Sequence, residues 1–103
     1  KLKNIKTLAL DFNQLTFLPQ QLGRAKSLQA LLLGHNQLKA VPTELVNLEN
    51  LELLDLSHNQ IALLPANLKK MKKLQTLLLT GNPITPAEQE RIKLALPQTF
   101  IQF

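Results

Sequence analysis

The chain has 103 residues, enough for one domain with a buried core, and its lack of cysteine excludes disulfides and thiolate–metal sites. A net charge of +5 and a pI near 9.8 make acidic partners a class worth testing. No apolar run approaches the ~18 residues of a membrane helix, and the N-terminus lacks the long apolar core of a signal peptide. Both a cytoplasmic and a secreted or surface location remain open.

One sequence motif recurs along the chain at a constant spacing. Its copies begin at Ile5, Leu28, Leu51 and Leu74, and each carries an asparagine at the same place: Asn13, Asn36, Asn59 and Asn82. Self-similarity at a fixed period is typical of solenoids built from stacked repeats. We therefore predict a single domain over 1–103, with repeats at about 5–27, 28–50, 51–73 and 74–84 and a C-terminal cap at 85–103.

Each repeat is expected to open with a short strand. In the third copy, Leu54 and Leu56 would point to one face of the strand, and Leu53 and Asp55 to the other. Because one strand cannot bury its leucines alone, parallel stacking on the next repeat should bury them and complete the hydrogen-bond ladder. The segment around Pro65 must then return the chain, in an extended or 3₁₀-like conformation.

The repeated asparagine is expected to have a structural role. Where the chain leaves the strand, backbone groups lose their ladder partners inside the core. A carboxamide supplies both a donor and an acceptor, so Asn13, Asn36, Asn59 and Asn82 are predicted to form a ladder that satisfies these groups.

The fourth repeat departs from the pattern and predicts a cap. Thr85 and Glu88 read as a capping box, in which each side chain binds the backbone N–H of the other, opening a helix to about Leu96. After it, 99–103 alternates as a fifth strand. Its Ile101 lies one position further from Leu77 than the repeat length requires.

The N-terminal end shows no equivalent cap. Leu2 occupies the slot that Ala25 holds in the next unit, and Ile5, Leu8 and Leu10 would form an open apolar layer beside an unpaired strand edge. Exposed edges favour pairing with another chain. We predict either a truncated or minimal member of its class, or coverage of this edge by a second copy.

The repeated strand pattern and the LPxxLxxLxx return segment resemble the 23-residue class of leucine-rich repeat proteins. That class includes Ras-group scaffolds and many bacterial proteins, and the tail from Asn82 to Phe103 resembles the ending of bacterial members, including those of leptospires. The resemblance implies an α/β fold: a right-handed solenoid with short parallel strands on its concave face, a 3₁₀ or extended convex side and a C-terminal capping helix. It also implies partner binding on the concave face.

The outward strand positions supply the candidate site. Leucines there are not needed by the core, and a contiguous exposed apolar patch usually marks an interaction site. The predicted apolar contacts are Phe12, Leu32, Leu53 and Leu78, and the predicted polar contacts are Asp11, Asp55, His35 and His58. The two aspartates are expected at the margin of the patch.

The sequence gives less support to metal binding, catalysis or nucleic-acid binding. His35 and His58 lie one repeat apart, but two imidazoles without a third ligand make a weak metal site or pH sensor. We predict no metal, no cofactor and no catalysis, because the chain has no phosphate loop and no enclosed carboxylate pair. Lys26, Glu49 and Lys72 share one slot and predict an alternating-charge ladder. No aromatic platform accompanies the lysines, which argues against nucleic acid.

The sequence thus favours a protein-interaction module that binds a partner protein on its concave face. One alternative is a structural fragment of a longer protein, self-associating through the N-terminal edge. A second alternative is polyanion binding by the lysine cluster at 69–73. The partner itself is not encoded in any motif.

Overall fold

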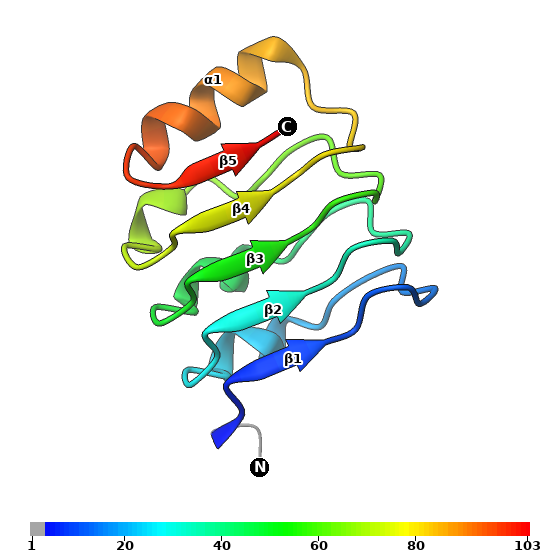
Figure 1. The fold of residues 1–103 in the computed structure, drawn as a ribbon, viewed down its shortest axis with the longest axis vertical. Coiled ribbons are helices and arrows are strands. Elements are labelled where there is room, and N and C mark those ends of the chain that lie inside the picture. The colour runs from blue at the N-terminus through cyan, green and yellow to red at the C-terminus, as the bar shows by residue number, and fades with distance from the viewer. Residues whose placement is uncertain (1–3) are drawn as a thin grey trace.

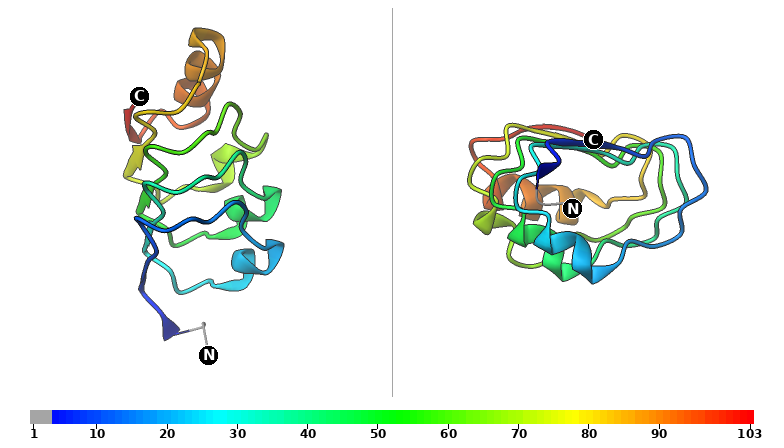
Figure 2. Two further views of the ribbon diagram at one scale, coloured as in Figure 1. Left: turned by 90° about the vertical axis from the view of Figure 1, so that its right-hand side faces the viewer. Right: turned by 90° about the horizontal axis from the view of Figure 1, so that it is seen from below.

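The computed structural model describes residues 4–103 and shows one layer of strands facing one layer of return segments (Figures 1 and 2). Leu2, which was assigned to a core slot, lies outside the described residues. The strands lie in chain order in one sheet: β1 (Thr7–Ala9), β2 (Ala30–Leu32), β3 (Leu53–Asp55), β4 (Thr76–Leu78) and β5 (Phe100–Gln102). All pair in parallel, so the predicted stacking of repeats is confirmed.

Strand register follows the sequence period. Leu54 pairs with Leu31 on one side and Leu77 on the other, each at the same position of the neighbouring repeat. Leu77 in turn pairs with Ile101, which confirms the slightly longer spacing expected at the last step. The inward leucines of the three middle strands are at most 2% exposed, because each lies between two apolar layers.

The return segments contain short 3₁₀ helices: η2 (Gln20–Arg24), η3 (Thr43–Asn47) and η4 (Leu68–Lys70). Pro19 and Pro42 immediately precede the first two, with φ of −71° and −67° that suit a helix entry. Leu22, Leu45 and Leu68 point from these turns into the core. The prediction of 3₁₀-like return segments is therefore confirmed.

The two ends of the solenoid differ. At the first repeat, Leu8 and Leu10 are only partly buried beside an apolar hollow of about 220 Å³, because no layer in the described range lies beyond β1. At the other end, helix α1 (Pro86–Ala95) takes the place of a return segment and lies over the last layer (Figure 1). Its Ile92 and the following Leu96 are buried.

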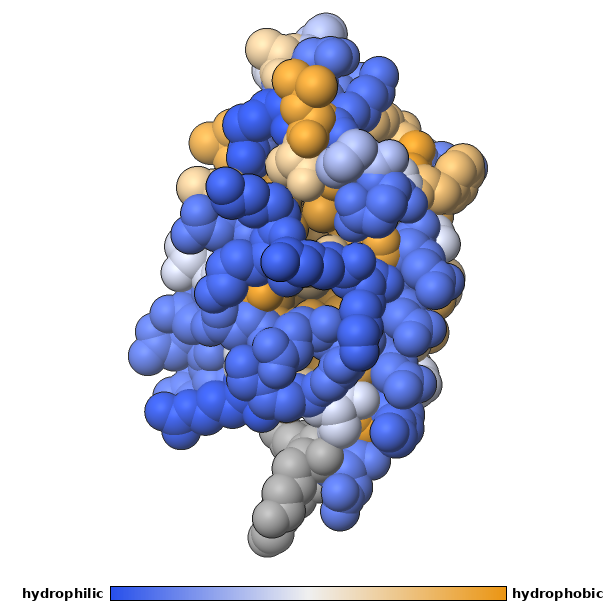
Figure 3. Space-filling view, turned by 90° about the vertical axis from the view of Figure 1, so that its left-hand side faces the viewer, coloured by the Kyte–Doolittle hydropathy of each residue, from blue (hydrophilic) through white to orange (hydrophobic). Residues whose placement is uncertain are grey.

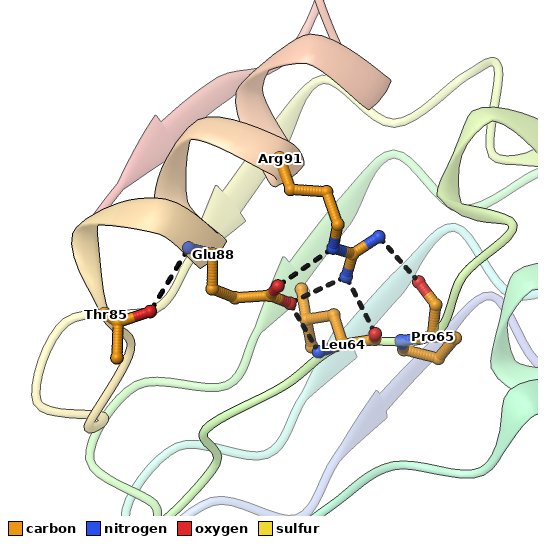
Figure 4. Close-up of polar contacts among 5 residues, drawn as sticks. All are labelled: Leu64, Pro65, Thr85, Glu88 and Arg91. Carbon is orange, nitrogen blue, oxygen red and sulfur yellow. Dashed lines mark hydrogen bonds and ion pairs between the residues drawn. The ribbon is translucent and has the colours of Figure 1, made fainter.

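Helix α1 is held by one buried carboxylate (Figure 4). The Thr85 hydroxyl oxygen accepts the N–H of Glu88 at 3.2 Å, as predicted for an N-cap. The reciprocal half of the capping box is wrong: the Glu88 carboxylate instead accepts the N–H of Leu64 at 3.0 Å and pairs with Arg91 at 2.6 Å. Arg91 also donates to the carbonyls of Leu64 and Pro65, at 2.8 and 3.5 Å. The carboxylate is thus used to join the cap to the preceding return segment.

These contacts perturb the ionisation of both side chains. Hydrogen bonds from the Arg91 guanidinium, with a smaller contribution from the Leu64 N–H, lower the pKa of Glu88 below its usual value, although burial opposes the shift. The hydrogen bond with Glu88 correspondingly raises the pKa of Arg91. Glu88 therefore stays ionised in a nearly closed environment.

Candidate functional site

The outer face of the sheet, which the fold class predicts to be concave, carries three columns of side chains. Strand register places Leu53 beside Ala30 and Thr76, and places Asp55 between Leu32 and Leu78. The three leucines are partly exposed, whereas their inward neighbours are closed to solvent. The structure therefore brings Leu32, Leu53 and Leu78 together on one face.

Asp55 occupies the centre of this group. It was expected at the margin of the apolar patch, but it separates Leu32 from Leu78 within one column. Its Oδ1 accepts both the N–H and the hydroxyl of Ser57, at 2.9 and 2.7 Å. A Cβ added at Gly34 would lie 3.0 Å from the Ser57 hydroxyl, so glycine leaves room for this pair. The patch is thus apolar with a fixed acidic centre.

A stack of rings follows the strands at their C-terminal ends. The rings of Phe12 and His35 lie 4.3 Å apart at 8°, and those of His35 and His58 lie 4.4 Å apart at 22°. Phe12 is 74% exposed and ends the stack. All three residues have φ between 56° and 60°, a left-handed conformation that L-residues rarely adopt. The sequence shows only that His35 and His58 lie one repeat apart, and no pattern in it indicates that the rings stack.

Gly81 continues the same column with φ of 84°. A Cβ there would lie 2.5 Å from Nδ1 of His58, so the imidazole occupies the space that a side chain would need. The last member of the column is therefore a glycine for two reasons, backbone conformation and the close approach of a ring.

The geometry of the two histidines does not suit a shared metal ion. Ring-nitrogen lone pairs lie in the ring planes, and two nearly parallel rings cannot direct them at one point. Within residues 4–103, no group of three or more histidine, cysteine or acidic side chains could hold a metal. The stack is better described as an aromatic surface beside the sheet.

Asp11 and Phe100 mark the two ends of the face. Asp11 is partly exposed at the end of the first strand. Phe100 pairs with Thr76 and so extends the column of Leu53 onto β5, where it is 62% exposed. Sequence reasoning missed Phe100 as a contact, although the alternation of 99–103 around Ile101 already placed it on the outer face.

The four asparagines lie behind the strand ends. Asn36, Asn59 and Asn82 each donate to carbonyls in two successive repeats and accept an N–H from the earlier one. For Asn59 these groups are the carbonyls of Leu33 and Leu56 and the N–H of Leu38, all at 3.0 Å. Asn13, at the open end, is exposed and bonds within its own loop.

Lys26 and the lysine cluster of 69–73 precede β2 and β4 in the chain. The edge where the strands begin is largely hydrophilic in Figure 3. The expected ion-pair ladder of Lys26, Glu49 and Lys72 is wrong, since Lys26 donates to the carbonyl of Asn47 at 3.0 Å. The one ion pair within residues 4–103 is that of Glu88 and Arg91.

Asparagine side chains hold two other lysines on this edge. Lys70 donates to Oδ1 of Asn47 at 2.7 Å, and Lys73 donates to Oδ1 of Asn50 at 2.9 Å. Both lysines line an open hollow of about 560 Å³ together with Lys72 and Glu49.

Comparison with known proteins decides the family. The leucine-rich repeat model matches residues 3–61 and 26–84. The chain belongs to the leucine-rich repeat family. Proteins of this family are generally non-enzymatic scaffolds, and membership supports a protein-interaction module.

Two solved structures show how closely the fold is shared. A leucine-rich repeat protein of Leptospira interrogans, LIC12759, is 40% identical with a TM-score of 0.95, over 96% of this chain and 25% of that one. An internalin of Listeria monocytogenes, InlF, is 21% identical with a TM-score of 0.54, over 94% of this chain and 36% of that one. The chain thus spans a quarter to about a third of the length of these two proteins. No curated protein matches it.

In residues 4–103, α1 is the one α-helix, and it is too short and too polar to cross a bilayer.

Proposed function

We propose that the outer face of the sheet binds a partner protein. The observation that carries the proposal is the gathering of Leu32, Leu53 and Leu78, partly exposed in a molecule whose inward leucines are closed to solvent. Exposed apolar side chains gathered around one polar group are characteristic of interaction sites. Phe100 and Phe12 add exposed aromatic area at opposite ends of the face, and aromatic side chains contribute strongly to interface energy.

The polar residues on this face would provide specificity. Asp55 is fixed by Ser57, so it can accept a donor from the partner with little loss of side-chain freedom. Asp11 offers a second carboxylate, and the rings of His35 and His58 offer polar edges beside a stacked surface. A partner with an apolar contact surface that includes one well-placed hydrogen-bond donor fits these features.

The test replaces two central leucines by lysine. Leu32→Lys with Leu53→Lys should leave the repeat folded, because neither side chain is inward, and should weaken partner capture at least tenfold. The matched control is Phe17→Lys with Leu63→Lys, which changes two residues that are 71% and 68% exposed and lie outside the sheet. Equal loss of binding in both variants, measured with purified partner by titration, would remove the outer face as the site.

A second candidate is polyanion binding at the lysines of 69–73. The observation in its favour is that Lys70 and Lys73 are already held in place by Asn47 and Asn50. Glu49 in the same hollow acts against it. Polyanion affinity should fall steeply between low and moderate salt, whereas binding by the outer face should depend on salt only weakly.

A further inference from the structure

The last strand of the sheet leaves its backbone open on one side. Phe100 donates its N–H to the carbonyl of Gln75 at 2.8 Å, and the carbonyl of Gln102 accepts the N–H of Leu79 at 2.7 Å. Backbone groups alternate in direction along a strand, so the N–H and C=O of Ile101 point to the opposite edge. Within residues 4–103 no strand lies beyond β5 on that edge.

A hollow accompanies this open edge. It has a volume of about 290 Å³ and lies between the end of α1 and β5, and its lining is mainly apolar: Lys93, Leu96, Pro97, Thr99, Phe100, Ile101 and Phe103. Leu94, next to Lys93 in the chain, is 74% exposed, and Phe100 is 62% exposed. In Figure 3, hydrophobic residues gather at this end of an otherwise hydrophilic edge.

We propose that the β5 edge and this hollow bind an extended, acidic segment of a partner protein, which adds to the sheet as a sixth strand. Added strands gain affinity from main-chain hydrogen bonds and specificity from pockets that take alternate side chains. Ile101 supplies the donor and acceptor, and the hollow accepts one apolar side chain over Leu96 and Phe103.

The positive charge of the chain favours an acidic segment over a second copy of the chain at this edge. Pairing of two β5 edges would bring together two molecules of net charge +5 and two copies of Lys93. An acidic segment instead places a carboxylate against Lys93. This site shares Phe100 with the outer-face proposal, but its hydrogen-bonding edge at Ile101 and its Lys93 do not belong to the outer face, so these two residues distinguish the proposals.

A displayed library of random heptapeptides is selected for binding to the 103-residue chain. The affinities of the enriched peptides are then measured. We expect enriched peptides to carry an acidic residue beside alternating apolar positions. Lys93→Glu and Phe100→Ser should each weaken their binding at least tenfold, while Lys69→Glu, which changes an exposed lysine on η4, and the Leu32→Lys, Leu53→Lys variant should retain it.

Amide hydrogen exchange provides the second readout and does not depend on peptide sequence. In the free protein, the Ile101 amide should exchange faster than those of Phe100 and Gln102, and bound peptide should slow it selectively. Failure to enrich any acidic apolar peptide, equal binding to Lys93→Glu, or an unchanged Ile101 exchange rate would each overturn the proposal. So would a dimer by light scattering that Phe100→Ser dissociates, because the edge would then be occupied by a second copy.

Discussion

Asn59 shows how one side chain joins two repeats. Its carboxamide satisfies two carbonyls and one N–H that the turn of the chain leaves inside the core. A hydrogen bond lost with its partner left buried costs more than the bond itself is worth, because the orphaned group has no water to replace it. The asparagine is therefore as much a part of the fold as the leucines around it.

Asn59→Ala should lower the free energy of unfolding by about 1–3 kcal/mol, because the buried N–H of Leu38 loses its partner and the carbonyls of Leu33 and Leu56 keep only their bonds from Asn36 and Asn82. Denaturant titration measures the change. Asn13→Ala is the matched control: this asparagine is exposed and bonds only within its own loop, so its loss should cost less than half as much. Equal costs at the two positions would contradict the inter-repeat role.

Glu88→Gln should lower the free energy of unfolding by about 1–2 kcal/mol, because it removes the charged hydrogen bond to Arg91. The loss is limited because glutamine still offers an acceptor to the N–H of Leu64 and because Arg91 is partly exposed. Because the folded pKa of Glu88 lies below the unfolded one, its contribution is present above the unfolded pKa of about 4.3 and is lost as the pH falls through the folded pKa. The difference between wild type and variant should thus shrink as the pH falls from above the unfolded pKa through the lower, folded one. A difference that stays constant over this range would show that the ion pair does not stabilise the cap.

At the scale of elements, the sequence period predicted most of what the structure shows. Each strand has three residues, too few to be stable alone, and depends on the strands beside it. The longer step from Leu77 to Ile101 could be foreseen, because α1 replaces a shorter return segment without moving the register. Periodicity determines which residues face inward, and burial follows from it.

The contacts that sequence reasoning missed involve side chains that have several polar groups within reach. Glu88 was assigned to Thr85 by a local rule, but the N–H of Leu64, in the preceding repeat, is brought next to it by stacking. Lys26 was assigned to Glu49 by its slot, yet the carbonyl of Asn47 lies within its reach. Local spacing cannot rank partners that only the folded chain brings together.

The candidate site was predictable in its columns and not in its detail. Register placed Leu32, Leu53 and Leu78 on one face, as alternation along the strands required. The left-handed backbone and ring stack of Phe12, His35 and His58 depend on the angle at which the chain leaves each strand. No sequence pattern specified that angle.

Within residues 4–103, the inward layers at the two ends of the sheet are covered to different degrees. Helix α1 covers the last inward layer, whereas the layer of Leu8 and Leu10 borders an apolar hollow. Self-association through this N-terminal edge stays a prediction. Light scattering over a range of concentrations should show a dimer that Leu8→Lys dissociates, and a monomer at every concentration would contradict it.

Residues that recur in every repeat and residues that vary between repeats lie on different faces. Leu54, Leu56 and Asn59 form the buried layer, while Leu53 and Asp55 lie on the other face of the same strand and are partly exposed. The division predicts that binding should be visible at particular leucines among the 26 in the chain.

Leucine-methyl NMR during titration with a purified protein partner tests this most directly. If the outer face binds the partner, the methyl signals of Leu32, Leu53 and Leu78 should shift together, while those of Leu63 outside the sheet and the inward Leu54 stay in place. Shifts confined to Leu63, or to leucines distant from the sheet, would show that the partner does not bind the outer face of the sheet.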